Sequence, residues 1–166
     1  MTNNEVKDFL AGFKTCMIAS LTPEQKVYAS TAPFAHDGNV FYILISTVAQ
    51  HGKNLLATNH VSLLFAEDES SCVQPYARKR ITVEASVQEV ARDTNNFDVG
   101  VNLLKDRFDT ELVANLANMS DFHLFALSAQ SGSAVMGFGQ AYRLDQNLEV
   151  ITHNTDHNQT THGHGK

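Results

Sequence analysis

Residues 37–45 read Asp-Gly-Asn-Val-Phe-Tyr-Ile-Leu-Ile, and this stretch decides the fold class. Asp-Gly is a favoured pair for the tight turn of a β-hairpin. The apolar residues 40–45, rich in β-branched and aromatic side chains, are typical of a strand buried on both faces. Residues 27–34, before the turn, have a similar composition, and Pro33 predicts an edge or a bulge at their end. We therefore predict an antiparallel hairpin of residues 27–34 and 40–45.

Further strands and helices are predicted on both sides of this hairpin. Residues 80–90 alternate apolar and polar side chains, which indicates a long strand with one exposed face. The other predicted strands are residues 16–21, 61–66, 122–127 and 133–136. The predicted helices are residues 6–13 and 46–59, the latter capped by Ser46 or Thr47, with one or two helices in residues 93–117. Hairpins with inserted helices predict a mainly β protein with helices, in the form of a small antiparallel barrel. An α+β sandwich is the alternative.

Charge and composition exclude several classes of protein. The 166 residues have a formal net charge of −6, whereas a general binder of nucleic acid or of anionic membranes needs a basic surface. We expect neither partner.

Cys16 and Cys72 form no CxxC motif and indicate reduced thiols rather than a disulfide framework. The amino terminus has no signal-peptide pattern, and no apolar run is long enough to span a bilayer. We therefore expect a cytoplasmic protein.

The end of the chain differs in character from the rest. Polar residues and glycine dominate residues 151–166, which include four of the eight histidines: His153, His157, His162 and His164. Such a tract cannot form a core alone, and its simplest property is adventitious metal affinity. Glycines on both sides of His164 also allow its imidazole to close over a pocket, and imidazole is a common axial ligand of haem iron. We divide the chain into a barrel domain, residues 1–150, and a tail, residues 151–166.

Three consecutive cations, Arg78, Lys79 and Arg80, enter the long predicted strand. Strand alternation would put Arg78 and Arg80 on one face and Lys79 on the other. One interpretation is a solvated charge run that protects a sheet edge. The other is an anion clamp, for the propionates of haem or for the phosphate of a flavin. The sequence leaves both interpretations open.

Asp121 and His51 are further candidates for a site. Asp121 precedes a predicted strand, so it is either a turn carboxylate or the acceptor for the N–H of a metal-bound histidine. His51 lies on a predicted helix and is the remaining histidine that we consider as a ligand. The sequence contains no HExxH, Walker A or GxSxG motif, and no GxGxxG in its proper context, which removes the common metalloprotease, nucleotidase, serine-hydrolase and Rossmann interpretations.

Several blocks of the sequence together resemble the HugZ/HutZ family of bacterial haem-utilisation proteins. In order along the chain they are residues 31–68, 77–80, 121–122, 137–142 and 163–164. The resemblance implies a split β-barrel related to the FMN-binding pyridoxamine-phosphate oxidase fold, and a homodimer with haem at each inter-subunit cleft. It implies that His164 ligates the iron, with His162 as the alternative, and that the tail closes over the haem. It also implies that Asp121, from the partner subunit, accepts a hydrogen bond from that histidine, and that Arg78 or Arg80 faces the haem.

The resemblance also implies an activity, because this family cleaves the porphyrin of haem with O2 and electrons and releases iron. We therefore predict a haem-degrading, oxygenase-like oxidoreductase for iron acquisition, with Asp121, Arg78 and Arg80 as catalytic residues. His164, the two arginines and His51 are the predicted cofactor-binding residues. Two alternatives remain. One is an FMN-binding oxidoreductase, in which the histidine-rich tail would have no role. The other is a non-enzymatic haem carrier or store. The sequence indicates neither the electron donor nor the protein that delivers haem.

Overall fold

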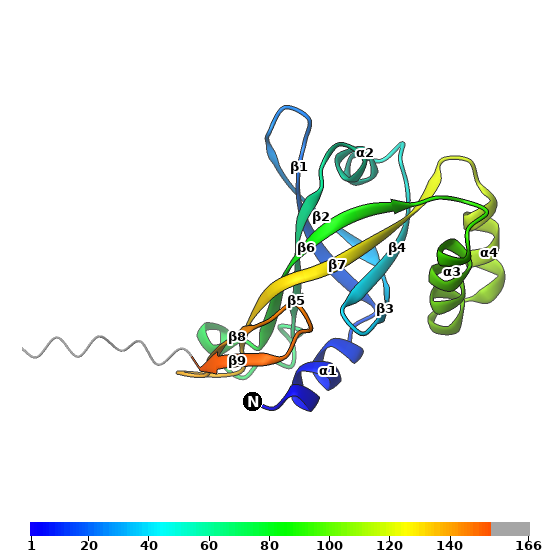
Figure 1. Ribbon diagram of the computed structural model, residues 1–166. Coiled ribbons are helices and arrows are strands. Elements are labelled where there is room, and N and C mark those ends of the chain that lie inside the picture. Colours follow the sequence, from blue (N-terminus) through cyan, green and yellow to red (C-terminus); the bar gives the residue numbers. More distant parts are fainter. Residues whose placement is uncertain (154–166) are drawn as a thin grey trace, which may run out of the picture.

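One antiparallel sheet organises residues 1–153, the part of the chain that the computed structural model describes. Its strands are β1 (Thr15–Leu21), β2 (Val27–Pro33), β3 (Ala35–Asp37), β4 (Val40–Ser46), β5 (His60–Ala66), β6 (Arg80–Val90), β7 (Phe122–Val135), β8 (Ala141–Leu144) and β9 (Val150–His153). Neighbouring strands follow the order β2-β1-β5-β6-β7-β4-β3, while β8 pairs with β7 and β9 pairs with β8. The sheet curls around its own core as half of a barrel (Figure 1), so the predicted mainly β architecture is confirmed.

The helices lie at the rim and on one side of this sheet (Figure 1). Their bounds are α1 (Asn3–Ala11), α2 (Gln50–Ala57), α3 (Asn95–Arg107) and α4 (Thr110–Asn118), with a short 3-10 helix η1 (Pro75–Ala77). Helix α1 begins at a capping box, in which the Thr2 side chain accepts from the Glu5 amide and the Glu5 carboxylate accepts from the Thr2 amide. Helices α3 and α4 pack together over β3, β4 and β7, so they cover one end of the sheet.

Aromatic rings fill the centre of the main core. The side chains of Phe34, Phe41 and Phe65 are fully buried, and their ring centroids lie 5.2 to 5.8 Å apart. These rings come from β4, β5 and the segment after β2, so their contacts join strands that are distant in the sheet order. Burial of each ring stabilises the fold by roughly 1.5–3 kcal/mol. The core therefore joins the two sides of the curled sheet.

The Asp-Gly turn is confirmed, because β3 and β4 pair through a turn in which Gly38 has a φ of +56°. The predicted partner of β4 is wrong, since residues 27–33 form β2 and pair with β1, and the short β3 at the end of the sheet takes their place. Strand β4, however, alternates buried and half-buried side chains instead of being buried on both faces. The prediction of separate strands at 122–127 and 133–136 is wrong, since β7 runs unbroken through both. Strand β9 also continues into the range assigned to the tail. The rest of the predicted tail, residues 154–166, lies outside the described residues.

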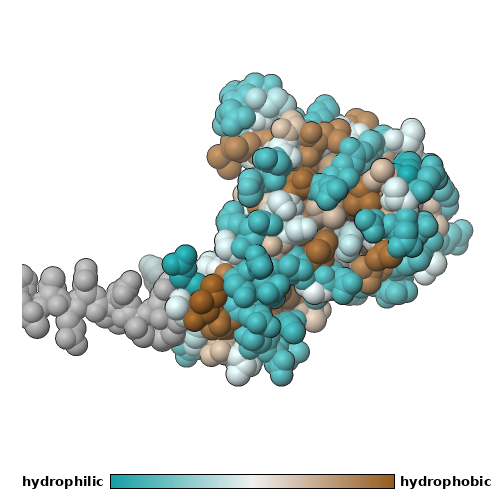
Figure 2. Space-filling view, in the orientation of Figure 1, coloured by the Kyte–Doolittle hydropathy of each residue, from teal (hydrophilic) through white to brown (hydrophobic). Residues whose placement is uncertain are grey.

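The outer surface of β1 and β2 carries exposed apolar side chains. Those of Met17, Leu21, Val27 and Tyr28 are between 37% and 80% exposed, and Figure 2 shows apolar surface on this arm of the molecule. Monomeric proteins rarely leave large apolar patches uncovered. Among the described residues, no helix is long and apolar enough to cross a membrane.

Candidate functional site

The predicted site residues lie at two opposite ends of the sheet. Arg80 begins β6 and pairs with Val135 at the end of β7, whereas Asp121 immediately precedes β7, beside the far end of β6 at Val90. At about 3.3 Å per residue, the length of β6 separates these ends by roughly 33 Å along the strand. Figure 1 shows β6 and β7 crossing the molecule between the end with α3 and α4 and the end with β8 and β9. One chain therefore does not bring Arg80 and Asp121 together.

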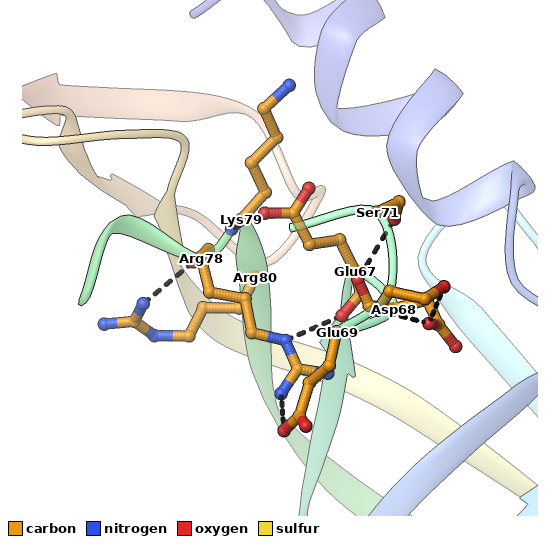
Figure 3. Close-up of polar contacts among 8 residues, drawn as sticks. Glu67, Asp68, Glu69, Ser71, Arg78, Lys79 and Arg80 are labelled. Carbon is orange, nitrogen blue, oxygen red and sulfur yellow. Dashed lines mark hydrogen bonds and ion pairs between the residues drawn. The ribbon is translucent and has the colours of Figure 1, made fainter. Parts of the chain in front are cut away.

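The side chain of Arg78 already forms hydrogen bonds within its own chain. Its Nε donates to the carbonyl oxygen of Glu67 at 2.6 Å, and a terminal guanidinium nitrogen lies 3.2 Å from Oε1 of Glu69. The backbone amide of Lys79 donates to the Glu67 carboxylate at 2.8 Å. Figure 3 shows these contacts closing the loop between β5 and β6. Arg78 therefore holds this loop, and its charge is partly compensated by Glu69.

Arg80 has a different environment from Arg78. Its guanidinium is half-buried and donates to the carbonyl oxygen of Arg78 at 2.9 Å, and no acidic side chain within residues 1–153 pairs with it. Arg78 precedes β6, so the expected strand alternation does not apply to it. The two guanidinium groups point apart in Figure 3. The prediction that both arginines share one face is therefore wrong, and of the two, Arg80 is the one without an ion pair within residues 1–153.

Asp121 is held at the junction of β4 and α2. The Ser46 hydroxyl donates to Asp121 Oδ2 at 2.6 Å, and the Thr47 amide donates to the Asp121 carbonyl oxygen at 2.7 Å. Within residues 1–153, Oδ1 of Asp121 has no hydrogen-bond donor. These contacts fix the carboxylate through one oxygen and leave the other able to accept an N–H. The side chain of Asp121 is thus oriented by a serine at the end of β4.

His51 lies in the first turn of α2, at the same end of the sheet as Asp121. This turn packs tightly on β4, since a Cβ on Gly52 would lie 2.2 Å from the Ser46 carbonyl oxygen. The buried side chain of Asn54 also ties α2 to β1 by donating to the Ser20 hydroxyl at 2.9 Å. Partial burial lowers the pKa of His51, which favours the neutral imidazole. His51 is therefore able to act as a neutral ligand.

The sequence interpretation missed the residues that orient Asp121. Ser46 and Thr47 were expected to cap α2, but its N-cap is Ala49, and both hydroxyls instead donate to Asp121. No local pattern signals this, because the contact joins residues 75 positions apart. Residues 1–153 contain no cluster of three or more potential metal ligands. The predicted iron ligand His164 and its alternative His162 lie outside the described residues.

Comparisons with known proteins agree on one family. Residues 2–136 match the pyridoxamine 5′-phosphate oxidase family. The chain is 32% identical over 161 residues to the protein named haem oxygenase HutZ from Vibrio cholerae, which covers 96% of this chain and 91% of that relative.

Solved structures give the same result. The crystal structure of V. cholerae HutZ, there called a haem storage protein, has a TM-score of 0.72 and covers 76% of this chain and 89% of its own. Campylobacter jejuni ChuZ is 29% identical with a TM-score of 0.79, and the match covers 90% of this chain and 61% of that one. A haem-binding protein of Mycobacterium smegmatis, 20% identical with a TM-score of 0.77, shares the fold. The predicted split-barrel fold class is confirmed.

Proposed function

The chain belongs to the pyridoxamine 5′-phosphate oxidase family and, within it, to the HugZ/HutZ type of haem-utilisation proteins, and from this premise we propose that it binds haem and cleaves its porphyrin ring oxidatively. The observation that carries the proposal is the 32% identity, over 96% of this chain, to a relative named haem oxygenase. Haem is then the substrate, and it also supplies the redox-active iron. The residues of this chain bind it, orient it and set the basicity of the iron ligand.

Arg80 supports the binding of a haem propionate. A propionate is a carboxylate. A guanidinium binds a carboxylate best when no other acidic side chain already accepts from its paired N–H donors. Arg80 meets this condition, because within residues 1–153 its guanidinium donates to a main-chain carbonyl oxygen and pairs with no acidic side chain. Arg78 would have to leave Glu67 and Glu69 first. We therefore assign the clamp to Arg80 and the support of the neighbouring loop to Arg78.

The separation of Arg80 from Asp121 supports a site built from two copies of the chain. The last described residue, His153, pairs with Tyr142 on β8, and β8 pairs with the end of β7 beside Arg80. The tail therefore leaves the barrel about three strand spacings, roughly 14 Å, from Arg80. We propose that one protomer contributes Arg80 and its tail, and that Asp121 comes from its partner. A two-fold dimer would also cover exposed apolar surface such as that on β1 and β2.

The free oxygen of Asp121 supports its proposed role towards the iron ligand. We propose that His164 donates its second ring N–H to Asp121 Oδ1, which fixes the ring orientation and raises the basicity of the imidazole. The Ser46 hydroxyl on Oδ2 withdraws part of the carboxylate charge, so the hydrogen bond to the histidine is moderated. An asparagine at this position cannot form the same charge-assisted bond.

The test is a titration with equimolar haem, followed by ascorbate in air. Wild-type protein should give a Soret band typical of histidine-ligated haem, and the band should disappear on addition of ascorbate. His164→Ala should lose most haem affinity or shift the band, whereas His157→Ala, in the same tail, should behave as wild type. Asp121→Asn should retain haem but degrade it abnormally. Wild-type spectra and rates in both His164→Ala and Asp121→Asn would refute the site, and His162→Ala and His51→Ala would then be the next variants.

A haem store is the second candidate, favoured because the crystal structure of HutZ describes that relative as a storage protein. A store would give the Soret band and keep it in the presence of ascorbate and O2. The FMN alternative rests on the family match. It would give flavin absorption and no dependence on His164.

A further inference from the structure

Arg92 lies in the turn after β6 and belongs to no site discussed so far. Its guanidinium donates hydrogen bonds to the carbonyl oxygens of Ala117, Met119 at 2.5 Å and Phe122 at 2.7 Å. The first two of these oxygens lie at the end of α4, and the third belongs to the first residue of β7. One side chain therefore spans the turn that contains Asp121. A planar guanidinium with five N–H donors can make such a set of bonds, whereas an ammonium group cannot reproduce its geometry.

The same turn is held from its other side by the end of β4. The Asp121 carbonyl oxygen accepts from the amide and the hydroxyl of Thr47, at 2.7 and 3.2 Å, and the carboxylate accepts from Ser46. From these contacts we infer that Arg92 is a positioning residue for Asp121. It fixes the α4–β7 turn so that Ser46 and Thr47 can orient the carboxylate. This inference rests on the proposed function of Asp121 as acceptor for the iron-ligating histidine.

A simple helix cap does not account for all of these contacts. Cations commonly bind the free carbonyl oxygens at the end of a helix, which explains the bonds to Ala117 and Met119. Phe122 lies beyond α4, and its carbonyl oxygen directly follows Asp121 in the chain. The ring of Phe97 lies 5.5 Å from the guanidinium carbon, which favours one placement of the side chain. Arg92 thus connects the turn after β6 to the residue next to Asp121.

The first test uses the haem-free protein and the exchange of the Thr47 amide hydrogen, measured by NMR. Arg92→Gln should free the turn, weaken the bond from Thr47 to Asp121 and raise the exchange rate at least about tenfold, as expected for the loss of a charge-assisted hydrogen bond. Arg92→Lys should give a smaller increase in the exchange rate, because lysine keeps the positive charge but not the planar set of N–H donors. Arg107→Gln is the matched control. Arg107 also donates to a carbonyl oxygen, that of Phe13, and lies over a phenylalanine ring, that of Phe34, so these contacts hold the segments before β1 and after β2 instead of the α4–β7 turn.

The second test uses the ferrous haem complex and the iron–histidine stretching frequency in the resonance Raman spectrum. Arg92→Gln should shift this frequency in the same direction as Asp121→Asn, and Arg107→Gln should not. Unchanged Thr47 exchange and an unchanged frequency, with a thermal midpoint lowered as in Arg107→Gln, would show a helix cap only and overturn the inference.

The two tests separate the inference from the proposed function. If Asp121→Asn changes neither haem binding nor the Raman frequency, the proposed function of Asp121 fails, and Thr47 exchange still decides whether Arg92 positions the turn. If Asp121→Asn has its effect and the Arg92 variants have none on exchange or frequency, the positioning role fails alone. Should Arg92→Gln not fold, the graded response of Arg92→Lys in the same two measurements decides.

Discussion

Replacing Arg80 by alanine should weaken haem binding, and replacing Arg78 should not. Arg78 already donates to the Glu67 carbonyl oxygen at 2.6 Å and lies 3.2 Å from the Glu69 carboxylate. Within the described residues, the Arg80 guanidinium donates only to a main-chain carbonyl oxygen, at 2.9 Å. A propionate would therefore gain a new charge-assisted bond at Arg80, but at Arg78 it would only exchange partners with an existing one.

The magnitude follows from the exposure of Arg80. A hydrogen bond between charged groups contributes about 1.5–3 kcal/mol when it is shielded from water. Because Arg80 is half-buried, solvent screening lowers this to about 1–2 kcal/mol. The dissociation constant should then rise roughly 5- to 30-fold. For Arg78→Ala, the remaining effect is a screened charge at longer range, which corresponds to less than about threefold.

The assay is a Soret titration of the wild type, Arg80→Ala, Arg78→Ala and Lys79→Ala at one ionic strength. Lys79→Ala is the matched control, since it removes the same charge from an exposed side chain between the two arginines. Circular dichroism checks that each variant is folded. A larger loss of haem affinity in Arg78→Ala than in Arg80→Ala would refute the assignment of the propionate clamp to Arg80. Equal losses in all three variants would also refute it, because they would show a general effect of net charge.

Three further predictions test the assembly and the fold. Sedimentation at micromolar concentration should give twice the 18.3 kDa mass of one chain, and a species of 18.3 kDa alone would contradict the shared site. Gly52→Ala should lower the free energy of unfolding by about 3 kcal/mol or more, because the new Cβ would lie 2.2 Å from the Ser46 carbonyl oxygen. An unchanged thermal midpoint would show that α2 does not pack this closely on the end of β4. Burial raises the pKa of the Cys16 thiol to about 12, so iodoacetamide at about pH 8 should modify Cys72 and spare Cys16 until the protein unfolds. Modification of Cys16 in the folded protein would contradict its burial.

The parts of the fold that follow from local pattern were predictable from the sequence. The predicted strand at 80–90 coincides with β6, because alternation reports directly on which face is buried. The break predicted within β7 is absent for a reason that is not local. Gln130 to Ser133 are polar or small, yet Ser131 and Gly132 pair with Glu84 and Val83 on β6. The neighbouring strand supplies hydrogen bonds that the residues of β7 do not themselves indicate.

For the candidate site, the sequence suggested residues but not their geometry. Strand alternation was assumed for Arg78, and it fails because the 3-10 helix η1 and the contacts to Glu67 hold this residue before β6 begins. The orientation of Asp121 by Ser46 and the span of Arg92 depend on contacts between distant segments. Such contacts exist only once the sheet has formed, so a single sequence gives no sign of them.

The distance of roughly 33 Å between the two ends of β6 has a genetic consequence for a site shared between copies. In a mixed dimer of Arg80→Ala chains with Asp121→Asn chains, one cleft collects both defects and the other collects neither. Two alleles that are each defective should therefore complement one another when expressed together, and about half of the clefts in such mixed dimers should bind and turn over haem normally. If each chain built its own site, every cleft would keep one defect and co-expression would restore nothing.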